Sequence, residues 1–314
     1  MSALGLGCSS MSHGYNPEER DDRESFEVVR RAVDLGISLF DTADVYGPYA
    51  NEELVGGALR SCHSKAAVAT KCGLVPAPDG TLRRNGRPEF LRRACEASLR
   101  RLDREVIDLY QLHRVDPAVP LEETWGALGE LVTEGKVRAL GISHATVDEL
   151  ARIHAVFPLT AVQYELSVWS TESLGTVLPW CRENGVGFLA FAPLGRGYLT
   201  GMVDGGSLAA ADSRRRDPRF GPDALRDNRA IVEGLRAIAE RHGATPSQIA
   251  LAWVLGQGTD IVPIPGTKRL RWLEENVAAT QIELTEQDHK EIAALPTATG
   301  EMSWDRERFP AALE

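Results

Sequence analysis

Four side chains that could perform acid–base chemistry occur at or just after short apolar segments of the sequence. Asp41 and Tyr46 lie in the stretch 39–47, Lys71 ends the next apolar segment, and His113 ends a later one. A nearby ammonium group stabilises a phenolate, so Lys71 could lower the pKa of Tyr46 while Asp41 serves as the counter-ion of Lys71. His113 could then orient a carbonyl oxygen or share the proton. This combination predicts proton transfer at a carbonyl group.

Each of these residues also has a simpler interpretation. Asp41 could form a turn or cap a helix, Lys71 could be a surface residue with a buried stem, and His113 could be a core histidine bonded to the backbone. The simpler interpretation is favoured for each residue alone. It is disfavoured for all four together, because the carboxyl ends of parallel strands are where barrels and open sheets place their sites.

The elements that must position these residues alternate regularly along the chain. Short apolar segments rich in β-branched residues alternate with amphipathic stretches, which is typical of repeated βα units. Eight strands are expected, at residues 4–8, 39–42, 67–70, 107–112, 139–142, 161–164, 187–192 and 261–264. We therefore predict an α/β fold of the (β/α)8 TIM-barrel type over residues 1–314 as a single domain.

A doubly wound sheet is disfavoured because no G-x-G-x-x-G motif follows the first strand. Gly5 and Gly7 lie inside that strand and are interpreted as sites of close packing. Helices are expected at residues 24–35, 88–102, 172–182 and 285–295, with capping boxes starting at Thr146 and Thr245. A long polar loop at about 201–227 is interpreted as a lid or mobile loop, and a C-terminal tail is expected from about residue 296.

Composition narrows the classes of function. The 314 residues are 43% hydrophobic and carry a formal net charge of −10, which argues against nucleic-acid or anionic membrane partners. No apolar segment is long enough to span a membrane and no signal peptide is evident, so a cytoplasmic location is expected. The five cysteines have no C-x-x-C spacing and are expected to be reduced packing residues; no metal site is expected.

Seven motifs extend along the chain: 40–47 followed by Asn51-Glu52, then 69–71, 108–113, 141–143, 162–164, 192–197, and 263–267 ending at Glu275-Asn276. In these motifs the chain resembles the aldo-keto reductases over nearly its full length. The segment Pro193–Gly197 and the pair Trp169-Ser170 resemble the branch that contains potassium-channel β subunits and many bacterial reductases.

The resemblance implies a catalytic tetrad of Asp41, Tyr46, Lys71 and His113, with Tyr46 as the proton donor and NADPH as the hydride donor. It also implies cofactor contacts for the nicotinamide, the pyrophosphate and the adenine end. These are Ser143, His144, Gln163 and Tyr164, then Pro193, Leu194, Gly195, Arg196 and Gly197, and finally Gly266, Thr267, Lys268, Trp272, Glu275 and Asn276.

Three positions depart from the family pattern. Trp272 stands where arginine is common at the 2′-phosphate; Lys268, Arg269 or Arg271 could supply the lost charge, so NADPH is expected over NADH. His144 stands where Asn or Glu is usual, and could contact the cofactor amide or cap the following helix. The usual N-terminal hairpin is expected to be missing, because the chain begins almost at the first strand.

The expected activity is reduction of an aldehyde or ketone, a small-molecule substrate. A homo-oligomer is compatible with the sequence. One alternative function is a nucleotide-binding regulatory subunit with little turnover, and another is a Schiff-base aldolase with Lys71 as nucleophile. Aldolase chemistry is disfavoured because Asp41 would keep Lys71 protonated. The expected walls of the substrate pocket are mostly aromatic, which suits an apolar or planar carbonyl compound: Met11, Tyr49, Trp169 and Phe220.

Overall fold

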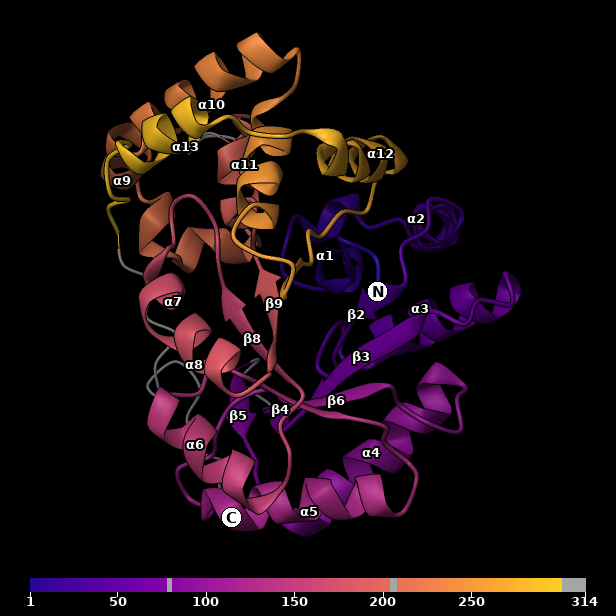
Figure 1. Ribbon diagram of the computed structural model, residues 1–314. Coiled ribbons are helices and arrows are strands. Elements are labelled where there is room, and N and C mark those ends of the chain that lie inside the picture. The colour runs from indigo at the N-terminus through magenta and orange to yellow at the C-terminus, as the bar shows by residue number, and fades with distance from the viewer. Residues whose placement is uncertain (78–80, 204–207, 301–314) are drawn as a thin grey trace.

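The computed structural model describes residues 1–77, 81–203 and 208–300 and contains an eight-stranded parallel sheet (Figure 1). The strands follow the order β1-β2-β3-β6-β7-β8-β9-β10, so each crossover adds a strand beside the preceding one. Their bounds are β1 Leu6–Gly7, β2 Leu39–Asp41, β3 Ala67–Cys72, β6 Leu109–Leu112, β7 Leu140–Ser143, β8 Ala161–Glu165, β9 Gly187–Phe191 and β10 Ile261–Pro263.

The sheet curls until its first and last strands meet. Gly5 N donates to Pro263 O at 2.9 Å, Gly7 N donates to Pro265 O at 3.1 Å, and Gly7 and Gly266 form a parallel bridge. This contact requires glycine in β1, because a Cβ at Gly7 would lie 2.6 Å from the carbonyl oxygen of Ile264. The predicted (β/α)8 barrel and the predicted close packing at Gly5 and Gly7 are both confirmed.

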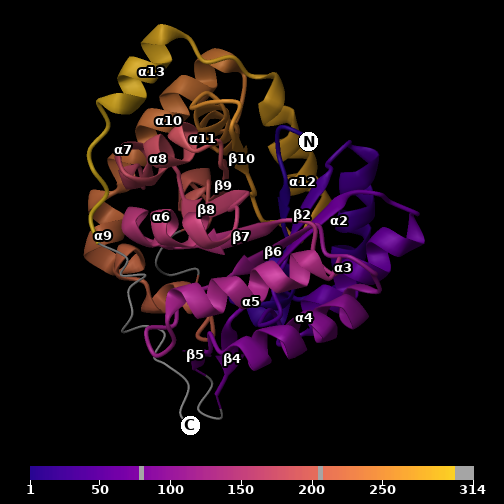
Figure 2. The same ribbon diagram turned by 60° about the horizontal axis from the view of Figure 1, so that its bottom comes forward.

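The helices lie on the outside of the sheet, as Figures 1 and 2 show from two directions. One helix separates most successive barrel strands from β1 to β8 in the chain, apart from short extra elements. Two α-helices lie between β8 and β9, three between β9 and β10, and two follow β10. The α-helices are α1 Ser9–Ser12, α2 Asp22–Asp34, α3 Ala50–Ser61, α4 Pro88–Leu102, α5 Leu121–Thr133, α6 Val147–Val156, α7 Glu172–Gly175, α8 Val177–Glu183, α9 Pro222–Asp227, α10 Arg229–His242, α11 Pro246–Leu255, α12 Leu270–Ala278 and α13 Glu286–Ala293.

Local signals at the helix ends act as predicted. Thr146 accepts a hydrogen bond from Glu149 N at 3.2 Å, and the Glu149 carboxylate accepts one from Thr146 N at 2.9 Å, which completes a capping box. Thr245 forms the same arrangement with Gln248 at the start of α11. Both predicted capping boxes are confirmed.

Two local features of the structure differ from the expectation. The expected helix at 172–182 is two helices, α7 and α8, because Pro179 lacks an N–H and its ring cannot be accommodated by an uninterrupted helix. The sequence reasoning also missed an antiparallel hairpin, β4 Leu74–Pro76 and β5 Leu82–Arg84, inserted between β3 and α4. Both are short, and β4 contains a proline, so neither has the alternation that marks a strand.

The described residues form three apolar clusters. The largest fills the space between the sheet and the helices, a second lies inside the barrel, and a small third joins Ala43 and Val45 to Leu74 of β4. The cluster inside the barrel is formed by Leu39, Ala69, Leu109, Ala161, Leu189 and Ile264. On four of the strands, the inward-facing residue two positions after the apolar one is polar; these residues are Asp41, Lys71, Gln111 and Gln163. Inside the barrel, a buried polar layer therefore lies at the carboxyl ends of the strands, directly above an apolar layer.

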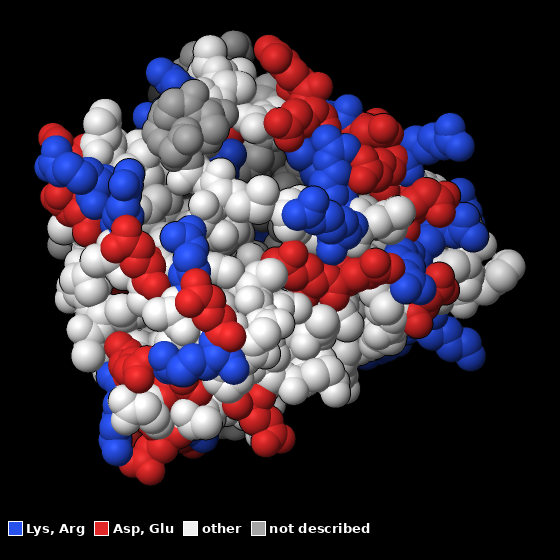
Figure 3. Space-filling view, turned by 90° about the horizontal axis from the view of Figure 1, so that it is seen from above, with Lys and Arg blue, Asp and Glu red and all other residues white. Residues whose placement is uncertain are grey.

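Other compositional expectations can be compared with the described residues. All five cysteines are free thiols, and every one except Cys62 is buried, as expected for packing residues. Among the described residues, no helix has the length and apolar character needed to cross a membrane, and no cluster of three potential metal ligands occurs. Acidic and basic side chains are interspersed on the face shown in Figure 3. Residues 301–314 of the expected tail lie outside the described residues.

The closure of the barrel yields a test of the fold. Gly7→Ala should lower the free energy of unfolding by about 1–3 kcal/mol, because the new methyl group collides with backbone rather than with a movable side chain. Gly126→Ala in α5 is the matched control: its Cβ meets nothing within 4 Å, so it should stabilise the protein by about 0.5–1 kcal/mol. Urea unfolding measures both, and equal effects would contradict this account of the closure.

Candidate active site

A buried ion pair lies at the centre of the polar layer. The ammonium of Lys71 on β3 donates to Asp41 Oδ1 at 2.5 Å and to the carbonyl oxygen of Thr42 at 2.8 Å. The two side chains are only 1% and 5% exposed, which excludes Lys71 as a surface residue. Burial by itself would lower the pKa of Lys71, but the negative field of Asp41 and the neighbouring Tyr46 raise it overall. Lys71 is thus held as a cation and is a poor nucleophile for Schiff-base formation.

The second oxygen of Asp41 is also fully engaged. Gln163 Nε2 donates to Asp41 Oδ2 at 2.8 Å, and Gln111 Nε2 donates to the same oxygen at 3.2 Å. Gln163 also donates to Gln111 Oε1 at 3.2 Å, so the two amides form a pair beneath the carboxylate. Gln111 was missed by the sequence reasoning as a site residue. The sequence could have predicted it: Gln111 lies two residues after Leu109 on the same strand, so both side chains point into the barrel.

Tyr46 lies beside this pair because of the turn that follows β2. Its hydroxyl oxygen is 3.4 Å from Lys71 Nζ, and Lys71 Nζ is 5.2 Å from the centre of its ring. The turn is held by Asn51, whose Nδ2 donates to the carbonyl of Cys8 and to Ser12 Oγ, each at 2.9 Å. Asn51 Oδ1 also accepts the hydroxyl of Thr42 at 2.6 Å.

The pKa of Tyr46 reflects two opposed effects. Burial raises it, and the charge of Lys71 together with the Lys71 hydrogen bond lowers it. The net direction is upward, so the net lowering of the Tyr46 pKa expected from the sequence does not occur. Lys71 acts in the expected direction, but removal of water from the phenol outweighs it.

His113 contacts Tyr46 from the end of β6. The rings meet edge to face with centroids 6.0 Å apart. His113 Nδ1 is buried and has no hydrogen-bond partner among the described residues. Burial lowers the pKa of His113 well below its ordinary value, and the charges of Arg114 and Lys71 lower it further. His113 is therefore a neutral imidazole with an uncommitted ring nitrogen at the mouth of the barrel.

Arg114, the residue after His113, connects the end of β6 to the end of β7. Arg114 Nη1 donates to Ser143 Oγ at 3.0 Å, so Arg114 is a second site residue to which the sequence reasoning gave no role. His144 has a left-handed backbone (φ 54°) and its ring lies 4.6 Å from that of Tyr164. Burial, followed by the charge of Arg114, places the pKa of His144 well below its ordinary value. His144 does not cap the next helix, because Thr146 occupies that position.

The loop Pro193–Gly197 follows β9 and turns sharply. Gly195, Arg196 and Gly197 all have positive φ, at 55°, 55° and 94°. A Cβ at Gly195 would lie 3.0 Å from the indole of Trp169, so glycine is needed there for space as well as for conformation. Within the turn, Gly195 N donates to Ala192 O and Gly197 N donates to Leu194 O, each at 2.9 Å, so these hydrogen bonds hold its shape.

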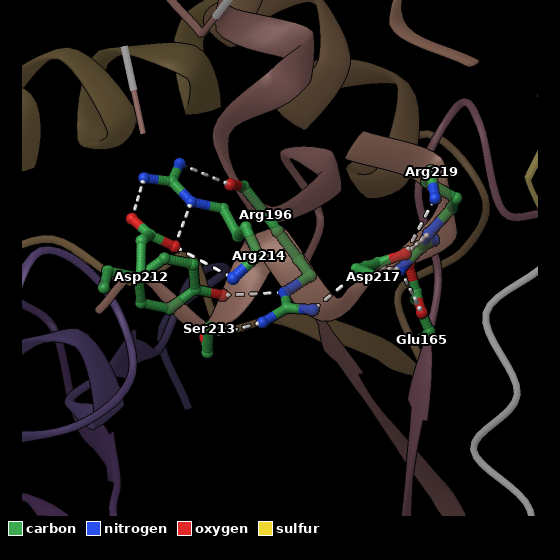
Figure 4. Close-up of polar contacts among 8 residues, drawn as sticks. Glu165, Arg196, Asp212, Ser213, Arg214, Asp217 and Arg219 are labelled. Atoms are coloured by element: carbon green, nitrogen blue, oxygen red, sulfur yellow. Dashed lines mark hydrogen bonds and ion pairs between the residues drawn. The ribbon is translucent and has the colours of Figure 1, made fainter. Parts of the chain in front are cut away.

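The side chain of Arg196 is committed to the long insertion that follows this loop. Figure 4 shows Arg196 between Ser213 and Asp217, and Asp217 between Arg196 and Arg219. Arg196 Nη1 donates to Asp217 at 2.9 Å, and Arg219 pairs with Glu165 on β8 at 2.6 Å. Residues 212–220 of the expected lid are thus fastened to the barrel by buried ion pairs, which the sequence reasoning did not foresee.

The residues assigned to the adenine end lie around the start of α12. Lys268 pairs with Glu19 at 3.4 Å, and Thr267 accepts a hydrogen bond from Arg269 N at 3.1 Å. The guanidinium of Arg271 lies 4.0 Å from the ring centre of Trp272. Gly266 adjoins Gly7 at the barrel closure, Asn276 is buried, and Glu275 accepts the Thr245 hydroxyl at 2.8 Å.

The four expected pocket residues have different surroundings. Trp169 and Phe220 are brought together, with ring centres 5.9 Å apart, and Trp169 also stacks on Tyr198. Met11 is fully buried in the core between sheet and helices. Tyr49 is 43% exposed and packs under Arg101. Of the four expected pocket residues, Trp169 and Phe220 are in contact with each other. Met11 packs in the core and Tyr49 packs against Arg101.

A (β/α)8 barrel whose strand ends gather a buried Lys–Asp pair, a tyrosine and a neutral histidine defines a barrel enzyme equipped for proton transfer. The sequence model of the Aldo/keto reductase family matches residues 3–296. The chain belongs to this family, and it is an oxidoreductase. The resemblance drawn from the sequence motifs is confirmed.

Known relatives agree with this assignment. The chain is 44% identical over 293 residues to "Probable aldo-keto reductase 1" of Glycine max, covering 93% of this chain and 84% of the relative. The glycerol dehydrogenase of Gluconobacter oxydans superimposes with a TM-score of 0.85 at 29% identity, covering 96% of both chains. An aldo-keto reductase of Klebsiella pneumoniae in complex with NADPH has a TM-score of 0.74 at 25% identity, covering 97% of this chain and 95% of that one.

The buried ion pair makes a double-mutant prediction. Asp41→Asn should lower the free energy of unfolding by about 3–5 kcal/mol, because it leaves Lys71 as an uncompensated buried charge. Adding Lys71→Met to Asp41→Asn should restore part of that loss. Urea unfolding of the two single variants and the double variant gives the coupling energy, and strictly additive losses would contradict a direct interaction.

The neutral histidines predict how stability depends on pH. The folded-state pKa of His144 is below its unfolded value, so the unfolded state binds more protons as the pH falls through about 6.5. Stability should therefore decrease from pH 7 toward pH 5, and His144 should contribute up to about 1.4 kcal/mol per pH unit. His144→Asn, which tolerates the left-handed backbone, should flatten the slope. An unchanged slope in urea titrations would show that His144 protonates equally in both states.

Proposed function

We propose that the protein reduces an aldehyde or ketone to an alcohol with NADPH as hydride donor and Tyr46 as proton donor. The observation that carries the proposal is the position of Lys71 Nζ, 2.5 Å from Asp41 Oδ1 and 3.4 Å from the hydroxyl of Tyr46. In this arrangement one cation links a fixed carboxylate to a phenol that can move a proton. Membership of the aldo/keto reductase family supports the same reaction.

The described residues fit a nicotinamide dinucleotide. The glycines of the turn at Gly195–Gly197 would let a pyrophosphate approach the backbone closely. Ser143, Gln163 and Tyr164 offer polar atoms and a ring for the nicotinamide end. Lys268, Arg269 and Arg271 lie at the start of α12. The first two pair with Glu19 and Glu24, so Arg271 is the cation that would neutralise a ribose phosphate. Related structures from Klebsiella pneumoniae contain NADP with acetate, or NADPH.

The cofactor supplies the hydride when bound, and the chain's own residues handle the proton. Tyr46 gives its hydroxyl proton to the carbonyl oxygen as that oxygen gains negative charge. Lys71 stabilises the phenolate left behind, and Asp41 keeps Lys71 charged. The neutral ring of His113 donates a hydrogen bond to the carbonyl oxygen and holds it beside Tyr46.

Preference for NADPH over NADH rests on Arg271 in this proposal. Lys268 and Arg269 already pair with Glu19 and Glu24, whereas Arg271 makes a ring contact with Trp272 and no ion pair within the described part of the chain. Its guanidinium is thus available to a 2′-phosphate while Trp272 provides a stacking surface. This arrangement would replace the arginine that is usual at position 272 in the family.

The proton-donor role is tested by Tyr46→Phe. The variant should bind NADPH as the wild type does, measured by fluorescence titration, but reduce carbonyl compounds about 10²–10⁴-fold more slowly, because the proton donor is gone. Full turnover by Tyr46→Phe would disprove the assigned mechanism. A wild type that binds NADPH yet reduces none of a panel of aldehydes, ketones and sugars would favour the regulatory-subunit alternative.

The cofactor preference is tested by Arg271→Ala. Loss of a charge-assisted contact worth about 1.5–3 kcal/mol should reduce the ratio of NADPH to NADH affinity by about 10–100-fold. Arg60→Ala on the exposed end of α3, where Arg60 forms an ion pair with Asp103, is the control and should leave the ratio unchanged. If Arg271→Ala weakens both cofactors equally, the residue does not read the 2′-phosphate.

A further inference from the structure

His13, in the loop after α1, lies against the ring of Tyr46. The two rings are stacked, with centroids 5.6 Å apart and planes inclined by 26°. His113 meets the same tyrosine edge to face at 6.0 Å, and Lys71 Nζ lies 5.2 Å from its centre. Tyr46 is thus bounded by three groups from three different elements, and only His13 covers a ring face by stacking among the described residues.

The backbone that carries His13 is held closely to the Tyr46 turn. A Cβ at Gly47 would lie 2.8 Å from the Cβ of Ser12, so the two segments touch where Gly47 has no side chain. Ser12 Oγ accepts a hydrogen bond from Asn51, the residue that also holds the turn after β2. His13 N donates to Ser9 O at 2.8 Å and fixes the end of α1. These contacts therefore hold the backbone of His13 next to the turn that carries Tyr46.

The far side of the same loop is fastened to the insertion. Gly14 O accepts a hydrogen bond from Ser213 N at 3.0 Å, and Asn16 N donates to Asp212 at 3.3 Å. The ring of Tyr15 lies 5.0 Å from the guanidinium of Arg214, and its hydroxyl accepts a hydrogen bond from Arg196 at 3.3 Å. The arginine network of Figure 4 thus restrains residues 14–16, next to His13.

The surroundings of His13 favour its neutral form. Burial lowers its pKa, and the positive charges of Arg20 and Arg196 lower it further. A neutral imidazole packs on an aromatic ring as a flat, weakly polar surface. It adds no net charge, so Lys71 remains the cation that acts on the Tyr46 hydroxyl. Both histidines that contact Tyr46 are therefore uncharged near neutral pH.

We propose that His13 is a positioning residue for the proton donor: its ring covers one face of Tyr46, excludes water and reagents from it, and keeps the hydroxyl directed toward Lys71. The part of this inference that concerns catalysis rests on the proposed function. The part that concerns shielding rests only on the contact geometry. His13 moves no proton in this account and acts entirely through Tyr46.

Chemical nitration tests the shielding without any need for activity. Tetranitromethane modifies accessible tyrosines, and one tryptic peptide, 32–60, contains both Tyr46 and the 43% exposed Tyr49. The ratio of the two nitration rates, resolved by fragment-ion mass spectrometry, has Tyr49 as an internal reference. His13→Ala should raise the Tyr46 to Tyr49 ratio at least several-fold, and His13→Phe, which keeps a ring over Tyr46, should leave it near the wild-type value.

Steady-state kinetics test the positioning. His13→Ala should lower kcat for carbonyl reduction about tenfold with little change in the affinity for NADPH, and His13→Phe should recover most of the loss. A purely structural role would not produce this rescue together with unchanged cofactor affinity. An unchanged nitration ratio in His13→Ala overturns the proposal, and so does a loss of kcat that His13→Phe fails to rescue.

The two proposals fail in different ways. If the wild type reduces no carbonyl compound, the proposed function fails, while the nitration ratio still decides whether His13 shields Tyr46. If the wild type is active and the nitration ratio does not respond to His13→Ala, the function stands and the inference about His13 fails. Circular dichroism and urea unfolding of both variants confirm that the comparison is between folded proteins.

Discussion

The structure of the site depends on the burial of one ion pair, Lys71 with Asp41. A cation and a carboxylate at 1% and 5% exposure are unfavourable unless every hydrogen-bonding atom is engaged. The barrel satisfies this condition with the Thr42 carbonyl on the lysine side and with Gln111 and Gln163 on the carboxylate side. The polar layer at the strand ends therefore follows from this constraint.

The same ion pair organises the groups around it. Tyr46 contacts Lys71, and His113 is kept neutral in part because Lys71 and Arg114 oppose a further positive charge. Burial raises the pKa of the phenol and Lys71 opposes that rise, so the acidity of Tyr46 is set by a balance between dehydration and charge. A bound substrate would meet a phenol whose conjugate base already has a cation 3.4 Å away.

Much of this could be predicted from the sequence, because the signals are local. Strands and helix caps are recognised from a few adjacent residues. Once a barrel is inferred, the residues at the strand ends are expected to lie close together. What was missed depends on closure in three dimensions. The contact of His13 with Tyr46 joins segments that only the barrel brings together, and the pairing of Arg196 with Asp217 depends on the path of a long insertion. Pro179 was a local signal that the helical pattern around it concealed.

The central claim is that Lys71 lowers the pKa of Tyr46 against the effect of burial. It is tested most directly by the titration of Tyr46 in protein labelled with ¹³C at tyrosine Cζ, with the resonance assigned through Tyr46→Phe. Lys71→Met should raise the pKa of Tyr46 above that of the wild type, and Lys71→Arg, which keeps the charge, should raise it less. An identical pKa of Tyr46 in the wild type and Lys71→Met would contradict the account.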